Sequence, residues 1–207
     1  SLANIALPDG VTVLESALFF RCENLSRVRI GRNVIRIETR AFYLCAKLNR
    51  ATLPDTLRSI GMEAFSGCHF LLEADIPNSV TSIEWRAFYD CRSLATAMLS
   101  ENMTTLADEV FFGCTKLTSL IIPYGITTIG TNAFGGCSRL ASIDLPNSIT
   151  TIRPNAFSGC TNLASVRIPD GLRSIPRDCF RNCRSITSVY IPASIQTIEL
   201  FAFAGCT

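Results

Sequence analysis

The chain has 207 residues, of which 48% are hydrophobic and 17% charged, and its formal net charge is +2. Because 19 basic residues nearly balance 17 acidic ones, no field of one sign attracts nucleic acid or an anionic membrane, and neither is expected as a partner. The apolar stretches are too short to span a bilayer, so no membrane insertion is expected in this segment.

A repeat of fixed length runs through the whole chain. Nine cysteines recur every 23 residues: Cys22, Cys45, Cys68, Cys91, Cys114, Cys137, Cys160, Cys183 and Cys206. Such a period is typical of a leucine-rich-repeat solenoid. We predict one solenoid domain over residues 1–207, with nine 23-residue repeats. A parallel β-sheet is expected on one face, and short strands, turns and helical turns on the other.

The ends of the chain resemble its interior repeats. Natural arrays close with atypical polar caps, because a bare terminal repeat exposes its apolar columns and its strand edge. We therefore expect the domain to be a segment of a longer chain that lacks its natural caps.

Each repeat begins with a strand and a turn. Apolar residues stand six and eight places after the cysteine, as in Val28 and Ile30, and side chains two apart on a strand share one face. A proline then follows in most repeats, as at Pro77 and Pro123, and ends the strand because it has no N–H to donate.

The second half of the repeat supplies the rest of the core. After a polar turn comes an apolar pair three residues apart, such as Ile126 and Ile129. Every repeat then places a phenylalanine three residues before its cysteine, and most place a glycine directly before it, where a left-handed backbone is expected. Stacked turns bury these residues in continuous columns that no single repeat could bury alone.

The cysteines are interpreted as core residues. One thiol per repeat, a strand spacing from the next, is too far apart for disulfides, and zinc sites pair their ligands more closely in sequence. Cys179 lies outside the period in a column occupied by alanine in six of the other repeats, and it forms a C-x3-C pair with Cys183. A metal site or a strained bridge there is the alternative to simple packing.

We expect no enzymatic activity. The only histidine, His69, falls in a variable polar column and is interpreted as a surface residue. A catalytic triad that contains histidine would have to use this residue. No phosphate loop or zinc signature is apparent, and no cofactor or metal is expected.

Outward positions of the strands are the candidate ligand contacts, since inward columns carry the fold. These positions stand five and seven residues after each cysteine. Along the chain they run from a basic end through an acidic band and an apolar pair to a mixed polar region. The candidate binding residues are Arg27, Arg29, Arg50, Glu73, Asp75, Met98, Ile121, Asp144, Arg167 and Tyr190. The alternative is a solvated face that only keeps the array soluble.

A second column is aromatic in the N-terminal half only. Two residues before each cysteine it contains Phe20, Tyr43, Tyr89 and Phe112, with Trp85 close by. Tyrosine and tryptophan are frequent in binding hot spots, so this edge is either a partner surface or packing beneath a turn.

The repeat resembles the BspA-type leucine-rich repeat. The resemblance rests on two alternating segments, Ile-Pro-x-Ser-Val-Thr-x-Ile, as at 76–83, and Ala-Phe-x-Gly-Cys-x-x-Leu, as at 64–71, and it extends over all nine repeats. Gly31 and Ser100 replace the proline, and Val110 replaces the alanine. Members of this family lie on bacterial and protist surfaces, and several are adhesins for host matrix proteins or other cells. No catalytic motif and no fixed ligand-binding motif accompany it.

The resemblance implies a non-catalytic protein-binding module at the cell surface or secreted, with an extracellular-matrix or cell-surface protein as partner. Ten cysteines also suit a reducing compartment, so a cytoplasmic scaffold or effector segment is an alternative. A structural spacer and a targeting arm of an enzyme are further alternatives.

Overall fold

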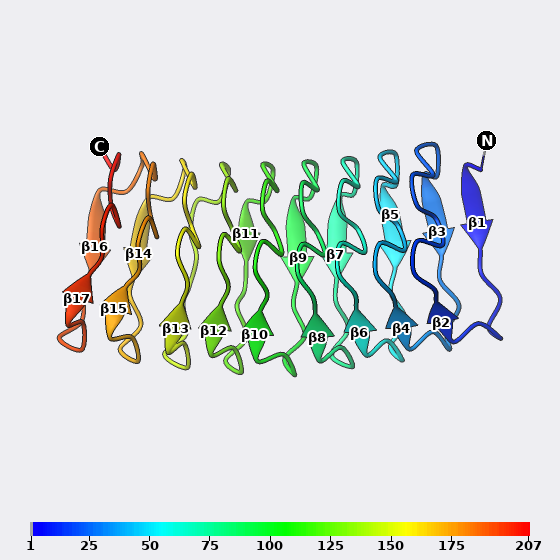
Figure 1. Ribbon diagram of the computed structural model, residues 1–207, viewed down its shortest axis with the longest axis horizontal. Helices are drawn as coiled ribbons and strands as arrows, with labels where there is room; N and C mark the ends of the chain where they lie inside the picture. Colours follow the sequence, from blue (N-terminus) through cyan, green and yellow to red (C-terminus); the bar gives the residue numbers. More distant parts are fainter. Residues whose placement is uncertain (1) are drawn as a thin grey trace.

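The computed structural model describes residues 2–207. The chain coils into an elongated parallel β-solenoid whose termini lie at opposite ends (Figure 1). Every strand pairing joins residues 23 apart, as Asn4 pairs with Arg27 and Arg27 with Arg50. The predicted solenoid and its period are therefore confirmed.

A first strand row lies along one side of the solenoid. It is hydrogen-bonded in the order β1-β3-β5, then β7-β9-β11, then β14-β16. The turn between β11 and β14 has no strand of its own and is linked by a single bridge from Ile121 to Asp144. The row consists of β1 (Asn4–Ala6), β3 (Arg27–Arg29), β5 (Arg50–Thr52), β7 (Glu73–Asp75), β9 (Thr96–Met98), β11 (Ser119–Leu120), β14 (Ser165–Arg167) and β16 (Ser188–Tyr190).

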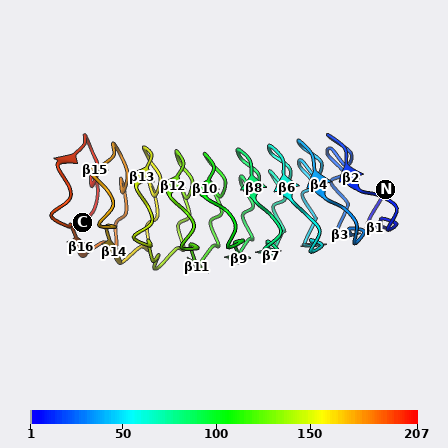
Figure 2. The ribbon, with the colours of Figure 1, turned by 90° about the horizontal axis from the view of Figure 1, so that it is seen from below.

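A second strand row runs parallel to the first, which Figures 1 and 2 show from two directions. Its strands have two residues each and pair as β2-β4-β6-β8, β10-β12-β13 and β15-β17. They are β2 (Val13–Leu14), β4 (Arg36–Ile37), β6 (Ser59–Ile60), β8 (Ser82–Ile83), β10 (Thr105–Leu106), β12 (Thr128–Ile129), β13 (Thr151–Ile152), β15 (Ser174–Ile175) and β17 (Thr197–Ile198). The predicted fold class includes short strands on this face, and their pairing into a second ladder adds to that prediction.

The prediction of helical turns was wrong, since residues 2–207 contain no helix. The segment before each cysteine has two left-handed residues instead, one directly before the cysteine, such as Gly67 at φ +73°, and one four residues earlier, such as Glu63 at φ +53°. The Phe65 N–H donates to the Ala87 carbonyl of the next turn at 2.8 Å. Hydrogen bonds between turns thus replace those within a helix.

Stacked phenylalanines form the centre of the core. From Phe19 to Phe203 the rings stack with centroids 5.0 to 5.8 Å apart. Rings from Phe42 to Phe180 are fully buried. Because each ring packs on its equivalents in the neighbouring turns, the phenylalanine column holds successive turns in register.

Most of the cysteines are buried as predicted, and every periodic thiol from Cys45 to Cys206 also donates a hydrogen bond to a backbone carbonyl of the preceding turn. The Cys68 thiol donates to the Phe42 carbonyl at 3.2 Å and the Cys91 thiol to the Phe65 carbonyl at 3.2 Å. All ten cysteines are free, and eight of them are buried. A small apolar group that also satisfies a buried carbonyl suits this position better than alanine would.

The last repeat departs from the predicted inward pattern. Ile191 is 42% exposed and Ile198 52% exposed, although their equivalents in the preceding repeat, Ile168 and Ile175, are buried. Each apolar column is covered from both sides by neighbouring turns, and the described chain has no turn beyond this one.

Candidate functional site

Alternation along the first strand row sets which side chains face solvent. In β3, Val28 is buried while Arg27 and Arg29 on either side of it are exposed. The ten candidate residues stand at such outward positions, and nine are exposed. Glu73 alone is half-buried, because its carboxylate lies 3.2 Å from the Arg50 guanidinium.

The basic end forms a shallow hollow of about 480 Å³ over β1, β3 and β5. Arg27, Arg29 and Arg50 line it together with Asn4 and Thr52. The strand register places Arg27 beside Arg50, an arrangement of like charges that destabilises a sheet. Among residues 2–207 no carboxylate lies within ion-pair distance of Arg27 or Arg29, since Glu73 pairs with Arg50 alone.

An acidic hollow of about 330 Å³ follows along the row. Asp75 on β7 lines it, and Asp55 and Glu101 join from the turns after the strands. All three carboxylates are exposed, and within the described chain none forms an ion pair. Met98 lies at the edge of the same hollow.

An apolar patch comes next. Met98 is 67% exposed and Ile121 82% exposed. Met98 is the last residue of β9, and Ile121 directly follows β11, which pairs with β9. Tyr124, which is 81% exposed, lines a further hollow of about 330 Å³ with Ile121, Asp144 and Pro146. This patch is named the Met98–Ile121–Tyr124 patch below.

Tyr124 is not among the binding residues predicted from the sequence, which are all outward strand positions. It is the one aromatic residue in a turn column otherwise occupied by Asp9, Arg32, Asp55, Asn78, Glu101, Asn147, Asp170 and Ala193. Comparison of that column would have found it.

Phe70 and Leu72 were missed for the same reason. They are 59% and 55% exposed, just before β7, in columns that are polar or small in the other repeats. Like Tyr124, they are apolar where the core does not require it.

The remaining candidates form a separate group. The Arg167 guanidinium lies 4.8 Å from the centre of the Tyr190 ring, a cation–π contact between β14 and β16, and 3.8 Å from the Asp170 carboxylate. The structure thus brings the basic residues together at one end and places Asp75 beside Met98 and Ile121 beside Asp144. Arg167 and Tyr190 belong to the next two turns and pair with each other.

The aromatic column packs mainly on itself. Phe20 stacks on Tyr43 at 5.2 Å and Tyr89 on Phe112 at 5.1 Å, with the small buried Ser66 between the two pairs. The Arg86 guanidinium lies 4.1 Å from the Trp85 ring and 4.9 Å from the Tyr89 ring. Three of the four aromatic residues in this column are half-buried, so the edge offers less free apolar surface than the strand row.

The Arg86 guanidinium also donates to Glu109 at 2.8 Å. This hydrogen bond is the main cause that raises the pKa of Arg86 above its ordinary value. The Arg86 side chain therefore links its own turn to the next one, which contains Glu109.

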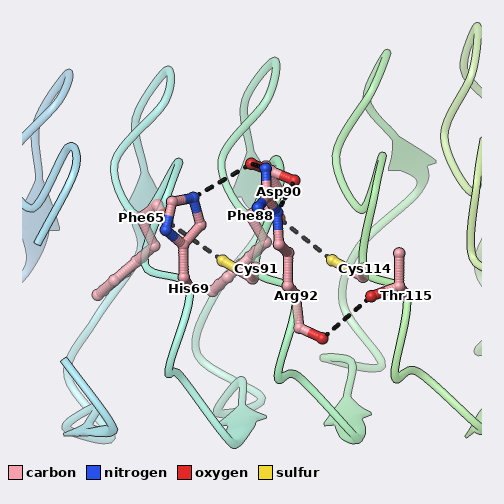
Figure 3. A network of polar contacts seen from close by, with 8 residues as sticks. All are labelled: Phe65, His69, Phe88, Asp90, Cys91, Arg92, Cys114 and Thr115. Carbon is pink, nitrogen blue, oxygen red and sulfur yellow. Dashed lines mark hydrogen bonds and ion pairs between the residues drawn. The ribbon is translucent and has the colours of Figure 1, made fainter. Parts of the chain in front are cut away.

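His69 lies at the surface but is not free of contacts. Figure 3 shows His69 and Arg92 both pointing to the carboxylate of Asp90, at 3.2 Å and 2.8 Å. The Arg92 guanidinium donates hydrogen bonds to the Asp90 carboxylate, and these bonds raise the pKa of Arg92. Beneath them the Cys91 and Cys114 thiols point at backbone carbonyls in the core, so this network joins turns and holds no nucleophile beside the imidazole.

The core environment makes the thiols unreactive. Burial raises the pKa of Cys45 to about 12 and raises that of Cys179 well above its ordinary value. A thiol that stays protonated is neither a nucleophile nor a metal ligand. In residues 2–207 no group of three or more histidine, cysteine or acidic side chains is arranged to hold a metal ion.

The described residues include no helix with the length and apolar character that a membrane crossing requires. Comparison with curated proteins finds none that matches the chain.

Solved structures of leucine-rich-repeat proteins are similar to this chain. A leucine-rich-repeat protein of T. pallidum is 26% identical with a TM-score of 0.65, over 99% of this chain and 77% of that one. A leucine-rich cell surface protein of Faecalibacterium prausnitzii is also 26% identical, with a TM-score of 0.57 over 100% of this chain and 63% of that one. The pneumococcal vaccine antigen PcpA shares the fold at 16% identity, with a TM-score of 0.55 over 96% of this chain and 56% of that one.

A family model matches the chain from end to end. It describes the BspA-type leucine-rich-repeat region, and its matches cover residues 1–117 and 86–207. The stacked phenylalanines, the buried cysteines and the left-handed residues before them are the physical basis of this repeat motif. The chain belongs to the BspA-type leucine-rich-repeat family.

Proposed function

We propose that this chain is a non-catalytic protein-binding module of a cell-surface or secreted protein. Its contact surface is the outer side of the first strand row. The similar F. prausnitzii protein is described as a cell surface protein, which supports this location. Its activity as an adhesin follows from the same proposal.

One observation carries the proposal: the Met98–Ile121–Tyr124 patch. These side chains are 67%, 82% and 81% exposed on a face where the core requires no apolar residue. Each of these side chains exposes apolar area to water. A partner that covers them stabilises the complex by about 25 cal/mol per Å² of apolar area buried. Large exposed side chains beside charged groups are typical anchors of a protein interface.

A pull-down from extracellular-matrix and whole-cell extracts tests the proposal. The chain is compared with Met98→Asp/Ile121→Asp and with the neutral variant Met98→Ser/Ile121→Ser. Thr105→Asp/Thr151→Asp is the matched control, because both threonines are exposed on the second strand row and neither hydroxyl has a hydrogen-bond partner within the described chain.

We expect one protein to be retained by the parent chain and the threonine control and lost by both patch variants. Equal retention by all four proteins would show that this face is not the contact surface. If nothing is retained above background, a cytoplasmic scaffold or a spacer becomes the better account.

A further inference from the structure

The outer side of the first strand row carries charges of both signs in separate blocks. Arg27 and Arg29 lie at one end without an ion-pair partner in the described chain, and Asp55, Asp75 and Glu101 lie beyond them, equally unpaired. The Arg50–Glu73 pair, at 3.2 Å, marks the boundary. The Met98–Ile121–Tyr124 patch follows the acidic block.

From this order we propose that the face binds an extended polypeptide segment that carries an acidic, a basic and then apolar side chains along the solenoid axis. This inference rests on the proposed function and names the kind of partner that it takes. The acidic side chain contacts Arg27 and Arg29, the basic one contacts Asp75 and its neighbours, and the apolar ones cover Met98 and Ile121.

The spacing of the blocks fits a chain of this kind. Adjacent strands are about 4.8 Å apart, so Asp75 on β7 lies about 10 Å from Arg29 on β3, and Ile121 about 19 Å from it. An extended peptide rises about 3.3 Å per residue and turns every second side chain to the same face. An acidic residue, a basic residue two positions on, and apolar residues four and six positions on therefore meet the three blocks in turn.

A uniform polyanion fits this face less well. Arginine forks bind sulfate, phosphate and carboxylate alike, so a sulfated glycan matches the basic hollow taken alone. However, the acidic block begins only about 10 Å further along the face, so a polyanion longer than this places its own negative charges directly against the carboxylates of Asp55, Asp75 and Glu101 and is repelled there. The glycan also supplies no apolar group for Met98 and Ile121.

Fluorescence anisotropy with two synthetic seven-residue peptides tests the inference. One reads Asp-Ser-Lys-Ser-Leu-Ser-Leu, and its matched control exchanges the charges as Lys-Ser-Asp-Ser-Leu-Ser-Leu. Each is also made in the reverse chain direction, because the blocks set an order along the axis and not the polarity of the backbone. Heparin, a sulfated polysaccharide, is measured in parallel.

We expect the acidic-first order to bind at least about tenfold more tightly than the exchanged order, in one of the two chain directions. The triple variant Arg27→Glu/Arg29→Glu/Asp75→Lys makes the basic block acidic and places a lysine between the carboxylates of Asp55 and Glu101, so the preference for the acidic-first order should be lost. All three residues are exposed, and an unchanged melting temperature verifies that the variant is folded.

Equal affinity for the two orders, or no binding of either up to about 1 mM, would overturn the inference. Heparin binding that depends on Arg27 and Arg29, without a preference between the peptides, would overturn it as well and assign the face to polyanions. In each of these cases the proposed function stands if a protein captured by the parent chain is still lost by Met98→Ser/Ile121→Ser.

Discussion

The two strand rows share one core but differ in what they show to solvent. In the second row the outward residue is serine or threonine in seven of nine turns: Ser59, Ser82, Thr105, Thr128, Thr151, Ser174 and Thr197. In the first row the outward position seven residues after the cysteine takes seven residue types in nine turns: Ala6, Arg29, Thr52, Asp75, Met98, Ile121, Asp144, Arg167 and Tyr190.

This difference separates what the fold requires from what it permits. Threonine suits a pleated, half-solvated surface, so its repetition along the second row has a structural reason. In the first row this outward position changes charge and polarity from turn to turn, whereas the outward position two residues earlier is variable only in the N-terminal turns and is serine or threonine from Thr96 to Ser188. Since packing does not explain that variation, recognition is the better explanation.

High pH should have the largest effect on stability, because it destabilises the core that both strand rows share. Burial raises the pKa of the core thiols above their value of 9.0 in the unfolded chain, to about 12 for Cys45. Their contribution to stability is complete below pH 9 and is lost as the pH rises toward the folded pKa, by about 1.4 kcal/mol per thiol and pH unit.

With eight buried thiols the combined loss exceeds that of any single substitution. Urea denaturation at pH 7, 9 and 10.5 measures it, and Cys91→Ala/Cys114→Ala should show a shallower dependence on pH. A midpoint that does not change between pH 7 and 10.5 would contradict this account of the thiols.

A substitution in the phenylalanine column should have the next largest effect. Phe111 is fully buried and stacks on Phe88 and Phe134, so Phe111→Ala should lower the free energy of unfolding by about 3–5 kcal/mol. Phe70→Ala, at a site 59% exposed, is the control and should change it by less than about 0.5 kcal/mol. Similar losses from both would mean that Phe70 also packs on the core.

Exchanging outward residues between the rows should have the smallest effect on stability. Ile121→Thr and Thr151→Ile each change one exposed side chain, so the free energy of unfolding should shift by less than about 0.5 kcal/mol. Only Ile121→Thr should weaken binding of the captured protein or of the acidic-first peptide. A large loss of stability from Ile121→Thr would give the apolar patch a structural role instead.

Much of this architecture follows from the sequence because the interactions recur at a fixed spacing. The period predicted the register of every strand pair, and the alternation about Val28 predicted which side chains face outward. The helical turns were wrong because left-handed residues such as Glu63 and Asn155 have no glycine to signal them. Their conformation is stabilised by hydrogen bonds to the next turn, which a single repeat does not contain.

The candidate site also has one part that the sequence predicts and one part that depends on the tertiary structure. The sequence by itself determined the nine-repeat solenoid, its buried columns and the ten outward residues, since each depends on a local pattern repeated along the chain. Only the tertiary structure decided that Tyr124 joins Ile121 around one hollow, that Glu73 neutralises Arg50, and that Arg27 and Arg29 stay unpaired among the described residues. Those relations depend on side chains from different turns, and stacking of the turns is what brings them together.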